Sequence, residues 1–386
     1  MVIGIPKEIL VNENRVAALP DAVRNYIEMG FKVIVECSAG KGSLWSDDEY
    51  EKAGAKITKE TESLFSQSDI ILKVKQPCFN DKIGKHEVEM MREGTILITF
   101  LHPAAPSNHE MIRLLRDRNI TAFTMDGIPR TSRAQKMDAL TSMSTVTGYK
   151  SVLIASNHLP KFVPMIGTAI GTIKPANFLI VGVGVVGLQA IATAKRLGGM
   201  VKVLDIREDA RKDAASLGAK IAGIDVPSDL ATGEGGYAKA LPLEWLEKER
   251  SMLRPLVEES DILILSALVP GEVAPVLITK EMAVNMKPGS VIVDVSIDQG
   301  GNCVLTKPGC EIIENDVYIC GLLNIPGSVP VHASWLYEKN MLEYVKNLFK
   351  KGIGSLDMED DIVQHSIVTY QGKIVHHGAI KAMKEG

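Results

Sequence analysis

Short apolar runs alternate along most of the chain with segments whose apolar residues recur every three to four positions. Runs bounded by turn-forming residues predict buried β-strands, and the three-to-four spacing predicts helices packed on them. In the first third the expected strands are Met1–Pro6, Phe31–Glu36, Ile70–Val74 and Thr95–Phe100, and the expected helices are Pro20–Met29, Asp47–Ala53 and Asn108–Arg116. Strands alternating with helices predict an α/β fold with parallel sheets.

A stretch of polar and small residues from Arg130 to Ser144 interrupts the alternation, and a helix is expected over Thr145–Ala155. A second alternation follows. Its expected strands are Ala176–Val181, Met200–Asp205, Lys220–Ile224, Asp261–Ser266, Ser290–Val295 and Val317–Leu322. The tail returns to helix from about His332 and ends in an expected hairpin over Ser366–His376. A chain of 386 residues is long for one hydrophobic core, so we expect two domains.

Composition narrows the class of protein. The apolar fraction is 46%, the charged fraction 23% and the net charge −4, which is ordinary for a globular protein and gives no footprint for nucleic acid. The five cysteines form no C-x-x-C pair, and the adjacent His376 and His377 would point to opposite faces of a strand, so no disulfide framework and no metal site is expected. Early charges at Lys7 and Glu8 argue against a signal peptide. A cytoplasmic protein, able to dock on a membrane partner, is the expectation.

One glycine pattern carries chemistry. An apolar run ends directly in Gly182-Val-Gly184-Val-Val-Gly187, and a helix-forming stretch follows. In a dinucleotide-binding turn the first glycine permits the sharp bend, the second lets backbone approach the pyrophosphate, and the third allows helix and strand to pack closely. The helix N-terminus adds N–H donors and a positive dipole end.

The next expected strand ends in Asp205, about 20 residues past the first glycine, where an acid meets the hydroxyls of the adenosine ribose. An acid there disfavours a 2′-phosphate, so NAD(H) is expected over NADP(H), and the nearby Arg207 is the residue that weighs the other way. Between Ile224 and Glu244 the sequence is rich in glycine, which predicts a mobile loop. Its Tyr237 would be an exposed aromatic with no core to join.

These features, with Gly4-Ile-Pro-Lys-Glu8, Ala267-Leu-Val-Pro-Gly271 and Met286–Asp294, resemble the alanine dehydrogenase and transhydrogenase α-subunit superfamily over essentially the full length. The resemblance implies two Rossmann-like domains flanking a cleft. The substrate-side domain would be residues 1–135 completed by 332–386, and the NAD(H)-binding domain residues 136–331. It also implies a homo-oligomer.

Several segments resemble the NAD(H)-binding component of proton-translocating transhydrogenase. They are Pro129–Asp138, the loop Gly235–Lys239, Gly300–Gly309 and Glu359–Val363. The resemblance implies that Arg130, Gln135, Asp138 and Thr141 hold the nicotinamide end and that Tyr237 closes over the nucleotide, with Ala267 and Asn324 also beside the cofactor. Thr141 stands where the pattern has Ser. The implied partner is an NADP(H)-binding subunit at the membrane, and the implied oligomer a dimer.

Four other residues resemble the substrate site of alanine dehydrogenase. Arg15 and Lys75 match the cations that hold a carboxylate and a keto oxygen, His102 the acid/base, and Asp298 the carboxylate of the cleft. Such a set suits a small 2-oxo or amino acid, because His transfers protons near neutral pH and cations stabilise developing negative charge. Transhydrogenase components usually lack the Lys, His and Asp together. This branch implies a hexamer.

The sequence therefore leaves three functions open. The first is a transhydrogenase component that passes hydride between NAD(H) and NADP(H). The second is a free-standing NAD-dependent amino-acid dehydrogenase, and the third is a nucleotide-binding module without turnover. Each site residue also has a structural alternative: Arg15 could pair with Glu13, His102 could be an ordinary loop residue, and Gln135 and Asp138 could begin a surface helix.

Overall fold

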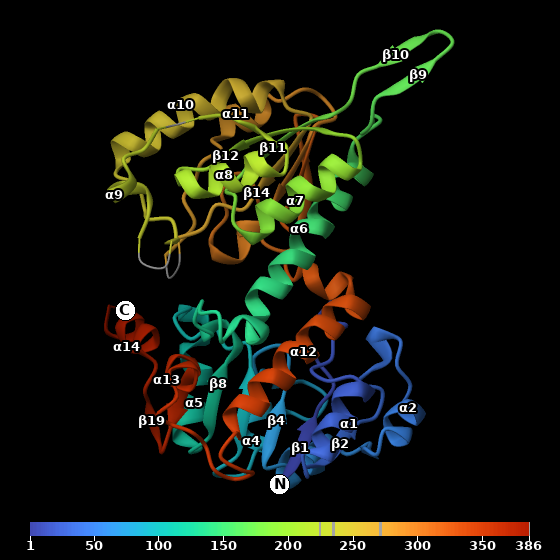
Figure 1. Cartoon of the computed structure of the whole chain (residues 1–386), viewed down its shortest axis with the longest axis vertical. Helices are drawn as coiled ribbons and strands as arrows, with labels where there is room; N and C mark the ends of the chain where they lie inside the picture. Colours follow the sequence, from blue (N-terminus) through green and yellow to red (C-terminus); the bar gives the residue numbers. More distant parts are fainter. Residues whose placement is uncertain (224, 234–235, 270–271, 386) are drawn as a thin grey trace. The chain divides into compact units, whose positions relative to one another are not determined.

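The computed structural model describes residues 1–223, 225–233, 236–269 and 272–385. The chain forms two compact units. Unit 1 comprises Met1–Met143 and Pro326–Gly386, drawn in blue, teal and red in Figure 1, and unit 2 comprises Ser144–Ile325, drawn mainly in green, yellow and orange. The predicted boundaries, after residue 135 and before residue 332, lie a few residues from those of the units. Within the described segments of the chain, no helix combines the length and apolarity needed to span a membrane.

Unit 1 is built on an eight-stranded sheet of order β19-β18-β8-β7-β4-β1-β2-β3. Its strands are β1 Val2–Ile5, β2 Lys32–Glu36, β3 Lys56–Thr58, β4 Ile70–Leu72, β7 Ile96–Thr99, β8 Thr121–Thr124, β18 Ile367–Tyr370 and β19 Lys373–Ile374. β1 to β8 of this sheet run parallel, whereas β18 pairs antiparallel with β8 and with β19. The C-terminal tail therefore completes the sheet of the first domain. A small hairpin, β5 Phe79–Asn80 and β6 Lys85–His86, lies apart from it.

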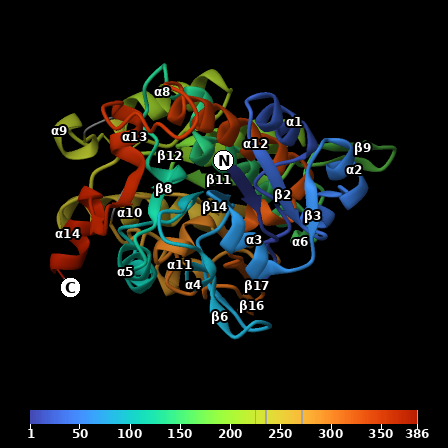
Figure 2. The ribbon, with the colours of Figure 1, turned by 90° about the horizontal axis from the view of Figure 1, so that it is seen from below.

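Helices cover both faces of this sheet. They are α1 Pro20–Glu28, α2 Asp47–Lys52, α3 Thr61–Gln67, α4 Glu87–Met90, α5 His109–Asp117, α12 Pro330–Leu348, α13 Asp361–Ser366 and α14 His377–Glu385. α1 and α12 lie on one face and α3, α4 and α5 on the other (Figure 2). The strands of the centre are fully buried because both of their faces are covered, which explains their continuous apolar runs.

Unit 2 is built on a seven-stranded sheet of order β13-β12-β11-β14-β15-β17-β16. Its strands are β11 Asn177–Val181, β12 Met200–Leu204, β13 Lys220–Ile221, β14 Ile262–Leu265, β15 Val291–Asp294, β16 Glu311–Glu314 and β17 Val317–Cys320. All run parallel except the edge strand β16. The six parallel strands thus have the order 3-2-1-4-5-6 of the Rossmann fold, whose direction of winding reverses between β11 and β14.

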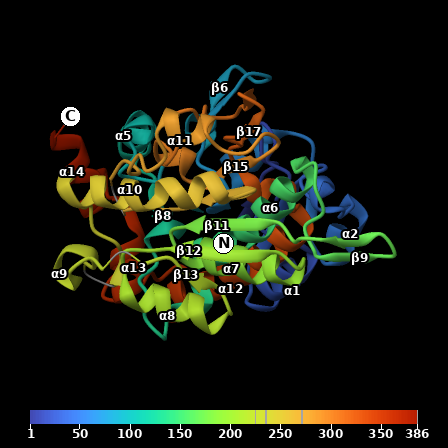
Figure 3. The ribbon, with the colours of Figure 1, turned by 90° about the horizontal axis from the view of Figure 1, so that it is seen from above.

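The helices of unit 2 form two layers. They are α6 Ala139–His158, which begins in unit 1, α7 Val185–Arg196, α8 Glu208–Ser216, α9 Ser228–Ala231, α10 Leu243–Glu259 and α11 Lys280–Val284. α7 and α8 lie on one side of the sheet and α10 and α11 on the other (Figure 3). Alternate residues of β11 enter the two cores, with Phe178 and Ile180 on one side and Leu179 and Val181 on the other. A hairpin of β9 Ile166–Thr168 and β10 Gly171–Ile173 projects from the unit (Figure 1).

Most predicted strands appear within one or two residues of their expected bounds, but three predictions need correction. The helix expected from Thr145 begins at Ala139, because Asp138 caps it. The segment expected to be irregular contains α9 and a bridge between Thr232 and Ala238. His377 begins α14 and does not lie in a strand beside His376. Further short helical turns are Lys41–Ser43, Pro106–Asn108, Met125–Gly127, Gln135–Met137, Val295–Gln299 and Ile325–Ser328.

A buried ion cluster holds the carboxyl end of β4. The ammonium of Lys73, 1% exposed, lies 2.8 Å from Glu87 Oε1 and 3.3 Å from Glu8 Oε2. Burial lowers the pKa of Lys73, but the charges of Glu8 and Glu87 outweigh it and leave the pKa raised. Glu8 also accepts the backbone N–H of Val74 at 2.6 Å, and Glu87 accepts that of Cys78 at 2.9 Å. The cluster therefore fixes the turn after β4.

Replacing Lys73→Met should lower the free energy of unfolding by about 3–5 kcal/mol, because two buried carboxylates lose their counter-charge. Lys85→Met is the matched control. Lys85 pairs with Glu62 at the surface, where both side chains are at least half exposed, so its loss should cost less than about 1 kcal/mol. Urea unfolding followed by circular dichroism measures both. Equal losses in the two variants would contradict the role of the cluster.

Candidate functional site

The glycine-rich turn of unit 2 connects β11 to α7. Gly182 has φ +86°, and a Cβ there would lie 2.7 Å from backbone atoms of Ser266 and Ala267. A Cβ on Gly187 would lie 2.2 Å from the carbonyl oxygen of Gly182. Only glycine fits at these two positions, because backbone cannot move aside as a flexible side chain does. The first and third glycines therefore serve the bend and the strand–helix contact, as the sequence predicted.

Gly184 plays a different role. It is the residue before the first turn of α7, no side chain caps the helix there, and no atom of the described chain lies within 4 Å of the position a Cβ would take. The N-terminus of α7 is thus approachable, and its N–H groups and positive dipole end suit a phosphate. The turn lies beside the point at which the sheet reverses direction, where α/β sheets bind their ligands.

Asp205 lies at the carboxyl end of β12, beside this turn. Its carboxylate is 4% exposed and accepts the backbone N–H of Val183 at 2.6 Å. Arg207 donates to both of its oxygens, from Nε at 3.0 Å and from Nη2 at 2.8 Å. The guanidinium is therefore occupied by the carboxylate, and a 2′-phosphate near Arg207 would also face Asp205. This geometry favours NAD(H) over NADP(H).

A second carboxyl group, which the sequence analysis missed, adds to this preference. Glu249 on α10 is 6% exposed. Burial, together with the charge of Asp205, raises the pKa of Glu249 to about 7. Near neutral pH a further partial negative charge thus acts on the region around Asp205, which disfavours an additional phosphate. The available signal was a charged residue on the apolar face of an amphipathic helix.

The loop after β14 is held by a buried amide, also missed. The side chain of Asn302 accepts the N–H of Ala267 at 3.0 Å and donates to its carbonyl at 2.9 Å. Asp294 in turn accepts the N–H of Asn302 at 2.8 Å. Ala267 is therefore fixed in place beside Gly182. Pro270 and Gly271, which belong to the same sequence motif, lie outside the described residues.

The glycine-rich loop is more ordered than expected where the structure describes it. Tyr237 is half-buried, and its carbonyl accepts the N–H of Gly233 at 2.8 Å. Arg207 donates to the carbonyl of Gly236 at 3.2 Å, which ties the loop to Asp205. Gly235 lies outside the described residues.

The residues predicted for the nicotinamide end divide into two groups in unit 1. Asp138 and Thr141 lie together, since Asp138 accepts the N–H of Thr141 at 2.8 Å and its hydroxyl at 2.6 Å, as a helix cap does. Arg130 and Gln135 are exposed on the preceding segment. This segment is anchored by Arg133, whose guanidinium binds Asp360 at 2.7 Å.

Arg15 and Lys75 lie near the carboxyl edge of the sheet of unit 1. Arg15 is buried and pairs with Glu13 through two nitrogens, at 2.8 and 2.5 Å. The backbone of Lys75 is held by neighbouring strands, because its carbonyl accepts the hydroxyl of Thr99 at 2.9 Å. The pairing of Arg15 with Glu13, foreseen as the structural alternative, is therefore present in the protein.

His102 follows β7 at the same edge, and a carboxylate that the sequence analysis missed accompanies it. Nδ1 of His102 lies 3.1 Å from Oδ2 of Asp126, whose side chain is 15% exposed. Burial raises the pKa of Asp126, but the charge of His102 and the hydrogen bonds from His102 and Thr124 outweigh it and leave the pKa lowered. Asp126 comes just after β8, so its position at a strand end was the available signal.

The last two predicted residues belong to unit 2. Asp298 is exposed in the helical turn Val295–Gln299, and Asn324 follows β17 with φ +55°. The four residues of the predicted substrate site are therefore divided, three in unit 1 and one in unit 2.

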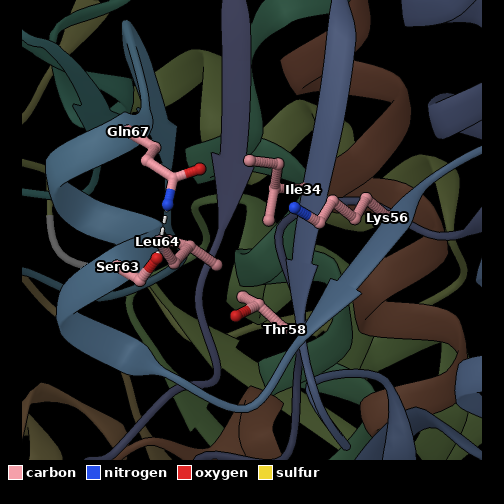
Figure 4. Close-up of a pocket in the computed structure, with 6 residues that line it drawn as sticks. All are labelled: Ile34, Lys56, Thr58, Ser63, Leu64 and Gln67. Atoms are coloured by element: carbon pink, nitrogen blue, oxygen red, sulfur yellow. Dashed lines mark hydrogen bonds between the residues drawn. The ribbon is translucent and has the colours of Figure 1, made fainter.

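Two other features hold none of these residues. A recess in unit 1 between β2, β3 and α3 has room for about one water molecule, with a volume of about 20 Å³ (Figure 4). It is lined by Ile34, Lys56, Thr58, Ser63, Leu64 and Gln67. In the described stretches of the chain, His, Cys, Asp and Glu side chains form no cluster of three suited to a metal ion.

Comparison with known proteins covers the whole length. The family models "Alanine dehydrogenase/PNT, N-terminal domain" and "C-terminal domain" match residues 4–147 and 151–377. The chain is 42% identical over 380 residues to the first of the polypeptides that make up NAD(P) transhydrogenase subunit alpha of Rhodospirillum rubrum, covering 97% of this chain and 98% of the relative. It is 32% identical over 392 residues to alanine dehydrogenase of Methanococcus maripaludis, covering 99% and 96%.

Solved structures give the same two branches. A transhydrogenase from Sinorhizobium meliloti superposes with a TM-score of 0.84 at 36% identity, covering 97% of this chain and all of that one. An L-alanine dehydrogenase superposes with a TM-score of 0.81 at 28% identity, covering 100% and 99%. With both halves matched by their family models and the relatives aligned from end to end, the chain belongs to the alanine dehydrogenase/PNT family.

Proposed function

We propose that this protein is the NAD(H)-binding component of an NAD(P) transhydrogenase, which passes hydride between its own NAD(H) and NADP(H) on a partner subunit. The observation that carries the proposal is the turn from β11 to α7 with Asp205 beside it, in a chain aligned over nearly its full length with the Rhodospirillum transhydrogenase polypeptide.

The residues present fit a bound NAD(H). The approachable N-terminus of α7 at Gly184 suits the pyrophosphate, and Asp205 suits the adenosine ribose. We assign the nicotinamide end to Arg130, Gln135, Asp138 and Thr141, with Tyr237 as the residue that closes over the nucleotide and Ala267 and Asn324 beside it. The nicotinamide ring, when bound, supplies or accepts the hydride, so that the protein itself has only to bind, orient and exclude water.

The partner in this function is an NADP(H)-binding subunit with membrane-embedded segments, to which this chain would dock from the cytoplasmic side. The assembly would contain two copies of this chain. Support comes from the name of the Rhodospirillum relative, which denotes one polypeptide of a larger enzyme.

Replacing Asp205→Asn should weaken NADH binding roughly 10- to 100-fold, because hydrogen bonds to a charged acceptor contribute about 1.5–3 kcal/mol. Asp209→Asn on α8 is the matched control, since the side chain of Asp209 is 95% exposed. Fluorescence titration with NADH measures both dissociation constants. The same affinity in the two variants would contradict the assignment of Asp205.

The transhydrogenase function predicts hydride exchange when the protein is mixed with membranes that hold the NADP(H)-binding subunits of a transhydrogenase. Reduction of a spectrally shifted NAD⁺ analogue by NADPH measures it. Membranes alone and the protein alone should both give background rates. A mixture that stays at background, with a protein that still binds NADH, would contradict this function.

A second candidate function rests on a different observation, the pair of His102 and Asp126 near Lys75 at the carboxyl edge of the sheet of unit 1. We infer that this edge serves an NAD-dependent amino-acid dehydrogenase, a function carried by relatives such as alanine dehydrogenase of Methanococcus maripaludis. In the reductive direction a 2-oxo acid, ammonium, NADH and a proton give the amino acid, NAD⁺ and water. Lys75 would orient the oxo acid, and His102 would transfer the proton.

This function predicts that the isolated protein oxidises NADH when pyruvate and ammonium are both added. His102→Ala should then lower kcat roughly 10²- to 10⁴-fold, because a positioned acid/base contributes about that factor. His377→Ala, at an exposed site on α14, should leave kcat unchanged. NADH absorbance follows the reaction. Turnover of His102→Ala at the wild-type rate would rule out His102 as the acid/base.

A further inference from the structure

We propose that Asp126 is a positioning residue that holds His102 as its Nδ1–H tautomer, so that Nε2 is the nitrogen that exchanges a proton with a small 2-oxo acid or its imine. The proposal deepens the second candidate function and rests on it. Asp126 is assigned no role by the sequence motifs. Its case comes from the backbone of His102, from the surroundings of Asp126 and from the other histidines of unit 1.

The backbone at His102 is held in an unusual conformation. His102 has φ +45°, in the left-handed region that L residues other than glycine, asparagine and aspartate seldom adopt. Its carbonyl accepts the N–H of Ala105 at 3.0 Å and the side-chain amide of Asn108 at 3.3 Å. Such strain persists only where the surroundings fix it, and it concentrates at functional sites.

The ring of His102 is oriented from two sides. It stacks on Phe100 with an interplanar angle of 1° and a centroid distance of 5.8 Å. Its Nδ1 lies 3.1 Å from Oδ2 of Asp126. Contact with an aromatic plane fixes the tilt of the ring, and the carboxylate fixes which edge faces β8. The two contacts together leave one orientation.

Asp126 is itself held so that one oxygen serves His102. Oδ1 accepts the hydroxyl of Thr124 and lies 3.4 Å from the backbone N–H of Leu101, while Oδ2 faces Nδ1 of His102. Because the carboxylate stays ionised, the favoured neutral ring carries its proton on Nδ1 and its lone pair on Nε2. When a protonated ring gives the Nε2 proton to the substrate, the ring charge falls from +1 to 0. The Nδ1 proton and the charge of Asp126 do not move.

Two other histidines of unit 1 provide an internal comparison. Nδ1 of His86 accepts the N–H of Val88 at 3.2 Å, and Nδ1 of His376 accepts that of Ala379 at 3.1 Å. An accepting Nδ1 places the proton of the neutral ring on Nε2. His376 also lies in the field of Asp126, which acts to raise its pKa against the effect of burial. Its Nδ1 is nevertheless engaged elsewhere, so it should keep the tautomer opposite to that of His102.

The test is the tautomer of His102 in the full-length protein, read from the ring nitrogen shifts in two-bond ¹H–¹⁵N correlation spectra with ¹⁵N-labelled histidine. His102→Gln assigns the signal. We expect Nδ1–H for His102 and Nε2–H for His86 and His376. Asp126→Ala should shift His102 to Nε2–H, and Asp117→Ala, a surface control on α5, should leave it unchanged. A wild-type His102 in the Nε2–H form would overturn the proposal, even if Asp126→Ala fails to fold.

The kinetic arm uses reductive amination of pyruvate. Asp126→Ala should lower kcat roughly 10²- to 10⁴-fold with KM for pyruvate changed only a few-fold, because Asp126 acts through His102. Asp126→Glu should recover a fraction of kcat, whereas Asp117→Ala should keep all of it. A shifted tautomer with unchanged kcat would overturn the role of Asp126. A wild-type protein with the Nδ1–H tautomer but no amination would instead contradict the dehydrogenase function.

Discussion

The structure depends most on one carboxylate at the end of one strand. Asp205 closes β12 and accepts the N–H of Val183, so it fastens the glycine-rich turn to the neighbouring strand. The turn in turn places the N-terminus of α7 beside the point where the sheet changes direction. A parallel sheet makes this possible because its strands end at the same edge, where their following loops can bind one ligand together. Arg207 and Glu249 act on the same carboxylate and set its charge environment.

Unit 1 uses the same principle for different chemistry. The carboxyl ends of β4, β7 and β8 carry Lys75, His102 and Asp126, and the ion cluster of Lys73 holds the turn after β4 from beneath. Unit 2 therefore offers a dinucleotide site, whereas unit 1 offers an acid–base pair. A family that contains both transhydrogenase components and amino-acid dehydrogenases suits this combination. Hydride exchange between nucleotides needs no acid–base pair, and reduction of an oxo acid does.

The sequence predicted features that depend on neighbours along the chain. The strands were found because their two faces are both buried, and the turn at Gly182 because three glycines stand between a strand and a helix. It missed Asp126, Asn302 and Glu249, whose partners are contributed by other elements and meet only in the folded unit. The start of α6 was misplaced because polar residues before it were taken for a loop, when one of them is the cap. Half-burial of Tyr237 likewise depends on contacts that no local pattern reveals.

The central claim is that unit 2 binds NAD(H) in preference to NADP(H), because its adenosine site is built on Asp205 with Arg207 already engaged. Calorimetric titration of the protein with NADH and with NADPH at neutral pH tests this most directly. The account predicts a dissociation constant for NADH at least roughly ten times lower, since a 2′-phosphate would lie against a buried carboxylate. Equal or tighter binding of NADPH would contradict it.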